Sequence, residues 1–414
     1  MRLIVSFAAL FVAVILLQLS SGGVGTLDAL SGLGLGFSAG QIGLLGSAHF
    51  AGFFIGCWWA PRLIGSVGYS RSFAAFTALG AIGLLGHILT DDPRAWAALR
   101  IASGLCIAGC YTVIEAWLQA KVTNETRGRS MGAYRLVDLG GQLLAQLMIG
   151  TLAGVELYVA YTLLTMFCCA SLLPLTLTRV SPPAMTGAPR LKPLLAIQRS
   201  PLAVSGVIVA GLTGSAYRMV GPIYGAEIGL SAEEVGLFLA ALIVGGAVAQ
   251  YPAGWLADRY DRRWVLIGFS LASIIGCMAS SLVTGADAAI AASAAFGLVT
   301  VPIYSVAAAH AHDFATSDER AELSAALIFY FALGAIISPV VVAQLIDVAG
   351  PRAFFGFIAV GHAGLVIYGL YRMLRRPTVT DKTAYVYAPR TSFLIGRLLR
   401  DKRDGKPGDK PDGE

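Results

Sequence analysis

The chain has 414 residues, of which 56% are hydrophobic and only 13% are charged. Because a soluble domain carries about 25% charged residues, this composition leaves too little polar surface for a water-soluble fold and indicates a membrane protein. The formal net charge of +6 comes from basic loops and a basic tail, and this placement indicates membrane orientation and not nucleic-acid binding.

Twelve apolar segments have close to the ~20 residues that an α-helix needs to cross a bilayer. In the first part of the chain they are Leu3–Gly25, Ile42–Ala60, Ser72–Leu89, Ala95–Leu118, Leu136–Leu152 and Tyr158–Leu177. The second part contains Leu202–Tyr224, Val235–Ala253, Trp264–Val283, Ala288–Ala309, Leu323–Leu345 and Ala353–Tyr371. We therefore expect an all-α membrane protein with twelve transmembrane helices.

The two parts of the chain match each other at a constant offset of 193 residues. The motif Ser38-Ala39-x-x-Ile42-Gly43-Leu44 recurs as Ser231-Ala232-x-x-Val235-Gly236-Leu237, and the same offset relates Gly104 to Gly297. A repeat of this length is a duplicated half-protein and not a solenoid unit. In an apolar chain, two related halves are typical of secondary transporters, in which one half rocks against the other around a central site. The first span is expected to be retained and not cleaved as a signal peptide, because its counterpart lies in the middle of the chain.

The repeat divides the chain into two pseudo-symmetric six-helix halves, at residues 1–178 and 201–371. The basic, proline-containing segment 179–200 predicts a short, partly extended cytoplasmic linker. The basic tail at residues 372–414 is expected to be cytoplasmic and disordered, because its composition cannot form a core. Phe393 and the apolar residues that follow it form either a short amphipathic helix on anionic lipid or part of a solvated chain.

Nearly all of the 30 Lys and Arg residues fall in loops on one side of the expected spans. The loops on the opposite side contain only Arg94 and Arg352. Because positively charged loops stay in the cytoplasm, both termini are expected there, and the protein is expected in the bacterial inner membrane.

The loop after the eighth expected span reads Gly254-Trp255-Leu256-Ala257-Asp258-Arg259-Tyr260-Asp261-Arg262-Arg263. It resembles the Gly-x-Leu-Ala-Asp-Arg-x-Gly-Arg-Arg signature of the major facilitator superfamily and departs from it at Asp261. Arg100-x-x-x-Gly104 is a second similar feature, whereas Leu136–Leu152 lacks the proline-glycine motif of drug/proton antiporters. Glu115-Ala116-Trp117 and Arg127-Gly128-Arg129 resemble a bacterial branch of the superfamily, the YcaD-like transporters.

This resemblance implies a membrane carrier without enzyme activity, which moves a small-molecule substrate by alternating access, is coupled to protons and works as a monomer. The sequence contains no phosphate-binding loop and no metal-ligand pattern, so we expect no cofactor and no metal. One alternative is proton-driven efflux of drugs or metabolites. Another is a non-transporting receptor or assembly factor on the same fold, because fold does not determine function.

The signature loop, which starts at Gly254, predicts a gate at the cytoplasmic ends of the halves. Asp258 is expected to bind the N-terminus of a facing helix, where the helix dipole favours an anion, or else only to end its own helix. The basic residues of the loop are Arg259, Arg262 and Arg263, and their expected acidic partners are Asp313, Asp318 and Glu319. Glu115 is expected to pair with Arg127 or Arg129 in this gate, with a role as central proton carrier as the alternative.

Polar residues inside apolar spans are the candidate substrate and proton groups, because charge in the bilayer interior is costly. They are His49, Arg100, Asp138, Gln142, Gln146 and Arg218. Arg100 acts on an anionic substrate group or a proton carrier, or it pairs with a helix-end carboxylate such as Asp28. Arg218 acts in transport or extends to the outer membrane surface.

Asp138, Gln142 and Gln146 recur at helical spacing and form a polar stripe. The stripe lines a cavity, unless Arg135 neutralises Asp138 at the membrane edge. His49 is a proton or substrate group, or a packing residue that makes a hydrogen bond.

Overall fold

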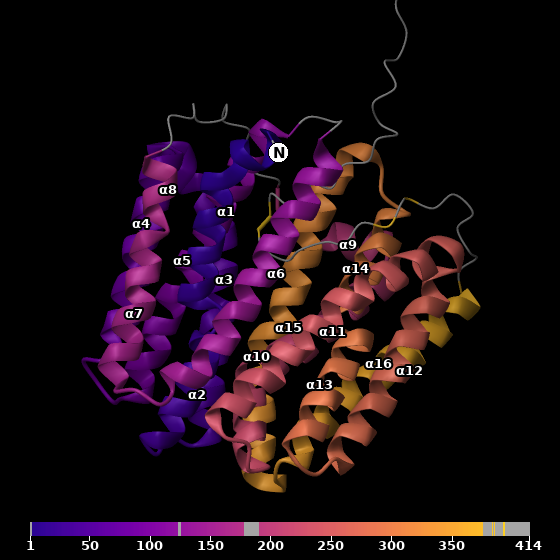
Figure 1. Ribbon diagram of the computed structural model, residues 1–414. Coiled ribbons are helices and arrows are strands. Elements are labelled where there is room, and N and C mark those ends of the chain that lie inside the picture. Colours follow the sequence, from indigo (N-terminus) through magenta and orange to yellow (C-terminus); the bar gives the residue numbers. More distant parts are fainter. Residues whose placement is uncertain are drawn as a thin grey trace, which may run out of the picture.

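The computed structural model describes residues 2–122, 126–177 and 190–375, together with Thr383, Tyr385, Ser392 and Phe393. These residues form α-helices, one short 3₁₀ turn and the connections between them, with no strand among them. Figure 1 shows two helical bundles side by side, one from the first half of the chain and one from the second.

The helices of the first half are α1 (Arg2–Ser21), α2 (Val24–Gly34), α3 (Ala39–Val67), α4 (Tyr69–Gly86), α5 (Pro93–Lys121), α6 (Arg127–Leu152), α7 (Leu157–Ala170) and α8 (Leu172–Thr176). The connecting helix α9 (Pro193–Arg199) follows. The second half contains α10 (Pro201–Glu227), α11 (Ala232–Arg259), α12 (Arg262–Leu282), α13 (Ala286–Thr300), α14 (Pro302–His312), η1 (Ser317–Glu319), α15 (Arg320–Ala349) and α16 (Arg352–Arg375).

The twelve predicted spans all correspond to helical segments, and three of these segments are broken into two helices. The first span is interrupted at Gly22 and Gly23, between α1 and α2. The tenth is interrupted before Pro302, which has no N–H to continue the hydrogen bonding of α13. The sixth breaks between α7 and α8.

Several predicted boundaries are wrong by six or more residues, among them the ends of α3 at Val67 and of α11 at Arg259. The first span continues past Gly25 to Gly34, and α6 begins at Arg127 and not at Leu136. Hydropathy finds the apolar centre of a helix, whereas backbone hydrogen bonding continues into flanking turns of mixed composition. Within the predicted linker, Pro193–Arg199 is helical, and residues 178–189 lie outside the described residues. Proline at the first helical position favours this start.

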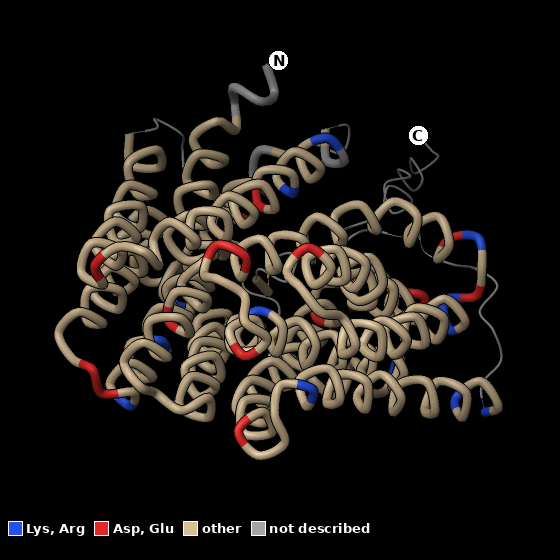
Figure 2. The backbone as a smooth tube through the Cα atoms, turned by 60° about the horizontal axis from the view of Figure 1, so that its bottom comes forward, with Lys and Arg blue, Asp and Glu red and all other residues tan. Residues whose placement is uncertain are grey.

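The outer surface of the bundle is apolar, as a lipid-facing surface must be. Among the described residues, ten helical segments are long and apolar enough to cross a membrane. Ile82, Leu136, Ile275, Leu282 and Val360 are between 64% and 75% exposed. Figure 2 shows that charged positions gather at helix ends and loops. Such a surface suits hydrocarbon and not water, so the chain is a multi-pass membrane protein.

The internal repeat is reproduced in the structure at corresponding positions. Ser38 and Gln41 form a capping box at the start of α3, and Ser231 and Glu234 form the same box at the start of α11. These reciprocal hydrogen bonds satisfy backbone donors that a helix start otherwise leaves unpaired. The structural equivalence therefore begins at the residues that carry the sequence match.

Equivalent glycines allow close helix crossings in both halves. A Cβ atom on Gly104 of α5 would lie 2.0 Å from the carbonyl oxygen of His49 in α3. On Gly297 of α13, a Cβ atom would lie 2.3 Å from the carbonyl oxygen of Leu242 in α11. Such distances exclude any side chain, so the backbones touch directly, as small residues permit in membrane bundles.

The halves meet closely at one end of the bundle, which we call the closed end. There the backbone N–H of Gly40 in α3 donates to Asp347 Oδ2 in α15 over 3.0 Å. A Cβ on Gly150 of α6 would lie 2.8 Å from Cα of Glu233 in α11. We call the opposite end the tail end, because the described tail residues lie there between the halves.

Candidate functional site

A central cavity lies between the two halves and is lined by both. It consists of two adjoining spaces of about 1060 Å³ and about 810 Å³, part of which is continuous with solvent. Both spaces share Leu139 and Gln142 of α6 and Gly214 and Arg218 of α10. The predicted polar stripe on α6 therefore lines the cavity through Asp138, Gln142 and Gln146.

Asp138 is held by two side chains from other helices. Its Oδ1 atom accepts a hydrogen bond of 2.5 Å from the Tyr111 hydroxyl of α5 and one of 2.7 Å from Gln18 Nε2 of α1. Gln18 Nε2 also lies 2.7 Å from the Tyr111 hydroxyl. The carboxylate thus points into the bundle, toward α1 and α5. Sequence reasoning missed Gln18 and Tyr111, although Gln18 was visible as an amide in an apolar span.

Gln146 binds the backbone where the first span is broken. Its Nε2 atom donates to the carbonyl of Gly22 over 2.8 Å, and its Oε1 atom accepts from the Thr26 hydroxyl over 3.0 Å. A broken helix leaves carbonyl groups without their usual partners, and in a membrane these need another donor. Gln146 supplies that donor, so α6 helps to fix the break between α1 and α2.

Arg218 and His49 both line the cavity. Arg218 lies in the wall formed by α10, and its extension to the outer membrane surface stays a prediction. His49 of α3 is partly buried, and its Nδ1 atom has no hydrogen-bond partner among the described residues. The cavity wall therefore carries an acid, a cation and an imidazole from three different helices.

Arg100 lies outside this cavity lining, in a buried cluster within the first half. Its Nε atom is 3.1 Å from Asp28 Oδ2, and both side chains are 2% exposed. The Tyr161 hydroxyl donates to Asp28 Oδ1 over 2.6 Å, and the ring of His87 stacks on Tyr161 with centroids 4.9 Å apart. Of the predicted alternatives for Arg100, the structure shows the pairing with Asp28. His87 and Tyr161 were missed.

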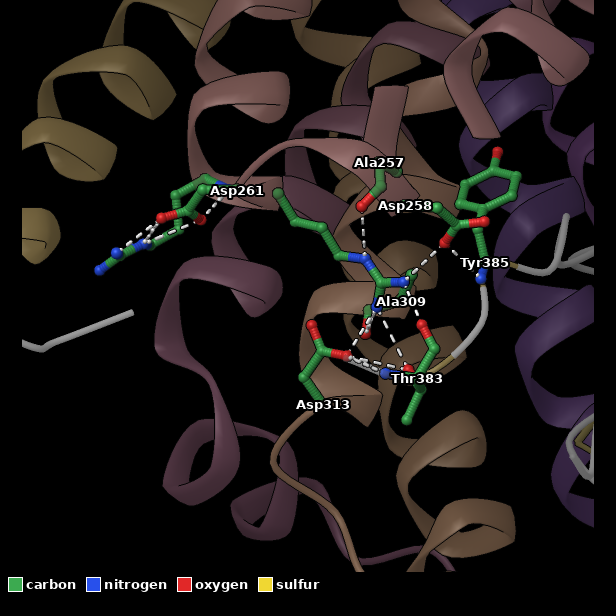
Figure 3. A network of polar contacts seen from close by, with 9 residues as sticks. Ala257, Asp258, Asp261, Ala309, Asp313, Thr383 and Tyr385 are labelled. Carbon is green, nitrogen blue, oxygen red and sulfur yellow. Dashed lines mark hydrogen bonds and ion pairs between the residues drawn. The ribbon is translucent and has the colours of Figure 1, made fainter. Parts of the chain in front are cut away.

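The signature loop is organised around Arg262, which is only 1% exposed. Its Nη1 atom donates to Asp313 Oδ1 over 2.7 Å and to the Ala309 carbonyl over 2.9 Å, and its Nη2 atom donates to Asp258 over 3.2 Å. Figure 3 shows these groups converging with Thr383 and Tyr385. Burial raises the pKa of Asp313, although Arg262 acts in the opposite direction. The predicted partnership between the loop arginines and Asp313 is thus formed by Arg262.

The other residues of the loop have local partners. Asp261, which departs from the signature, caps α12 by accepting from the backbone N–H of Arg263 and also pairs with the Arg263 guanidinium over 2.7 Å. Arg259 lies over the ring of Trp255 at 5.5 Å. Glu319 pairs with Arg199 of α9 instead of with the loop.

Among the described residues, Asp258 makes no contact with the N-terminus of a facing helix in this conformation. Asp258 is 53% exposed, and its partners among the described residues are Arg262 and the backbone N–H of Tyr385. Glu115 is fully buried and accepts hydrogen bonds from the Tyr134 hydroxyl over 3.1 Å and from Ser392. The side chain of Arg127 lies outside the described residues and Arg129 is exposed, so pairing of Glu115 with these arginines stays a prediction.

Two six-helix halves around a polar cavity, with an apolar outer surface, define a membrane carrier. A sequence profile described as Major Facilitator Superfamily matches residues 203–403. An uncharacterized MFS-type transporter of Enterobacter sp. (strain 638) is 30% identical over 322 residues, which are 77% of this chain and 83% of the relative. The chain therefore belongs to the major facilitator superfamily and is a secondary transporter, not an enzyme.

Other relatives and solved structures agree with this assignment. The MFS-type transporter YcaD of Escherichia fergusonii is 28% identical over 322 residues, covering 77% of this chain and 83% of YcaD. The nucleoside transporter NupG superimposes with a TM-score of 0.71 at 14% identity, over 91% of this chain and 100% of NupG. A D-xylose-proton symporter superimposes with a TM-score of 0.69 at 14% identity, over 91% of this chain and 98% of the symporter. The structural matches establish the shared fold, and the family expected from the signature is confirmed.

Proposed function

We propose that the protein moves a small polar solute across the bacterial inner membrane together with protons. The observation that carries this proposal is the central cavity, which is lined by both halves and contains Asp138, His49 and Arg218. Charged groups at such a depth are costly, and they are retained where a substrate or ion pathway needs them. The D-xylose-proton symporter offers a precedent for proton coupling on this fold.

The lining chemistry favours a solute with a polar end and a carbon skeleton. Arg218 and Gln142 provide hydrogen bonds in the part of the cavity that both spaces share. Leu239, Ile243 and Phe296 provide an apolar wall on the side of the second half. A ligand pocket of this kind combines apolar contact area with a few polar groups that set orientation.

Asp138 is the proposed proton carrier. It lines the cavity and is connected to Tyr111 and Gln18, whose contacts would change when the carboxylate gains a proton. A protonated carboxyl donates a hydrogen bond where the carboxylate only accepts, so protonation reorganises this group of three residues. Glu115 is assigned to the gate, because it lies at the tail end and binds Ser392.

We further propose that the tail end faces the cytoplasm. Arg62, Arg71 and Arg262 lie at this end, whereas Arg94 and Arg352 begin helices at the closed end. An excess of basic residues marks the cytoplasmic side. In this orientation the described conformation is closed toward the periplasm.

The test is proton flux into proteoliposomes, read with an internal pH dye while sugars, nucleosides, organic acids, amino acids and cationic drugs are added one class at a time. We expect acidification with one class, lost in Asp138→Asn. Asp91→Asn is the matched control, because Asp91 is an exposed loop carboxylate. Unchanged flux in Asp138→Asn would remove Asp138 as carrier. Uptake of a radiolabelled compound without any proton flux would refute proton coupling.

A further inference from the structure

The described tail residues contact both halves at the tail end. Thr383 and Tyr385 bind the second half, and Ser392 and Phe393 bind the first. We propose that this surface is a docking site for the chain's own tail, and that the docked tail holds the carrier in the conformation that is closed at the other end. The proposal rests on the alternating-access function argued above.

On the second half, the tail binds Asp258 of the signature loop and Asp313, which is the partner of Arg262. The backbone N–H and the hydroxyl of Thr383 donate to Asp313 Oδ1 over 2.8 and 2.9 Å. The backbone N–H of Tyr385 donates to Asp258 Oδ1 over 2.9 Å, as Figure 3 shows. Hydrogen bonds to carboxylates are stronger than those between neutral groups. Asp258 and Asp313, which both bind Arg262, thus also accept hydrogen bonds from the tail.

The ring of Tyr385 fits against the glycine that begins the signature. A Cβ atom on Gly254 would lie 2.8 Å from Cδ1 of Tyr385, and the Tyr385 hydroxyl donates to Gln250 Oε1 over 3.1 Å. Gly254 and Gln250 lie one helical turn apart on α11, so they present one face to the ring. The tail therefore packs along the tail-end part of α11.

On the first half, the tail enters the protein interior. Ser392 is fully buried and its hydroxyl donates to Glu115 Oε2. Phe393 is 3% exposed, and its ring lies 6.5 Å from that of Phe54 in α3, which in turn contacts Phe329 of α15 at 5.4 Å. Phe393 is thus buried in protein, and neither predicted alternative, lipid contact or a solvated chain, applies to this residue. The other tail residues of that predicted helix lie outside the described residues.

Occupation of this surface conflicts with closure of the tail end. In a rocking carrier, the tail-end parts of the two halves, to which α5 and α11 belong, approach each other when the closed end opens. The side chains of Tyr385 and Ser392 now take up contacts on those two helices. The tail must therefore leave before the halves can close here, and a bound tail biases the equilibrium toward the described conformation.

A thiol reporter at the closed end tests this bias without any substrate. Ser47 of α3 is 7% exposed, and its hydroxyl accepts from the backbone N–H of Val340 in the other half over 3.3 Å. In Ser47→Cys, the thiol is protected until the closed end opens. The protein is placed in lipid nanodiscs and labelled with a maleimide. Each protein that is tested is also prepared without Ser47→Cys, which gives the background labelling of the native cysteines.

Three versions are compared: the full chain, a chain ending at residue 382, and a chain ending at residue 393. We expect the chain that ends at residue 382 to be labelled about tenfold faster than the full chain, which is a modest population shift. The chain that ends at residue 393 should be labelled at the same rate as the full chain. Full-length Ser392→Ala/Phe393→Ala is the companion variant, and it should also label faster. Size-exclusion profiles confirm that each version is folded. Equal labelling rates in all versions would overturn the proposal and leave the proton-flux test of function unaffected.

Discussion

The two equivalent glycine crossings allow a quantitative test of how the halves are packed. In Gly104→Ala, the new Cβ atom would lie 2.0 Å from the carbonyl oxygen of His49. Carbon-to-oxygen contacts between packed helices are about 3.3–3.6 Å. The clash is with a backbone atom, which cannot rotate away as a side chain does. Helices α3 and α5 must therefore separate by more than ~1 Å.

The expected loss of stability follows from two opposing effects. Overpacking costs about 1–3 kcal/mol, and a clash with backbone belongs at the upper end of that range. Alanine gains about 1 kcal/mol over glycine in helix propensity. The net loss is therefore about 2 kcal/mol for Gly104→Ala. Gly297→Ala should lose a similar amount, because its Cβ would lie 2.3 Å from the Leu242 carbonyl oxygen.

The assay is thermal unfolding of purified protein in detergent. The measured quantity is the fraction of protein that remains monodisperse after heating to each temperature. Both substitutions should lower the Tm by several degrees. The control is Gly364→Ala in α16, where a Cβ atom would meet no atom within 4 Å. Its Tm should equal or slightly exceed that of the wild type. A wild-type Tm for Gly104→Ala would refute the inferred backbone contact.

Two further predictions concern charged pairs. Asp28→Asn leaves Arg100 buried without its carboxylate and should lower the free energy of unfolding by about 3–5 kcal/mol. Tyr161→Phe removes one hydrogen bond to that carboxylate and should lower it by about 1.5–3 kcal/mol. A smaller Tm loss for Asp28→Asn than for Tyr161→Phe would contradict the pairing. The hydrogen bond from Arg199 lowers the pKa of Glu319 below its ordinary value of 4.5, so this pair stabilises the protein above that pH and the stabilisation is lost as the pH falls through the lowered pKa. Glu319→Gln should therefore lower the Tm slightly at pH 7, which corresponds to a loss of less than ~1 kcal/mol in the free energy of unfolding. The Tm difference between variant and wild type should vanish in acid. A Tm difference that persists in acid would exclude the ionic contribution.

Helix identity and the repeat were accessible from the sequence because both depend on local patterns. Twelve apolar runs predicted the helical segments, and the repeated motif that begins at Ser38 and Ser231 lies at matching helix starts. The signature loop predicted the family and one of its ion pairs, Arg262 with Asp313. Helix ends were less accessible, because Arg127 starts a helix in a polar segment that hydropathy assigns to a loop.

The partners of the polar residues were decided by the tertiary structure. The sequence shows that Asp138 and Glu115 lie in or near apolar spans, but Tyr111 and Ser392 reach them from positions 27 and 277 residues away along the chain. Composition likewise assigned the tail to solvent or lipid, whereas Phe393 is buried against Phe54. Hydropathy and helical periodicity describe which side of one helix is apolar. They do not describe which other helix or segment covers that side, and this choice depends on packing of the whole bundle.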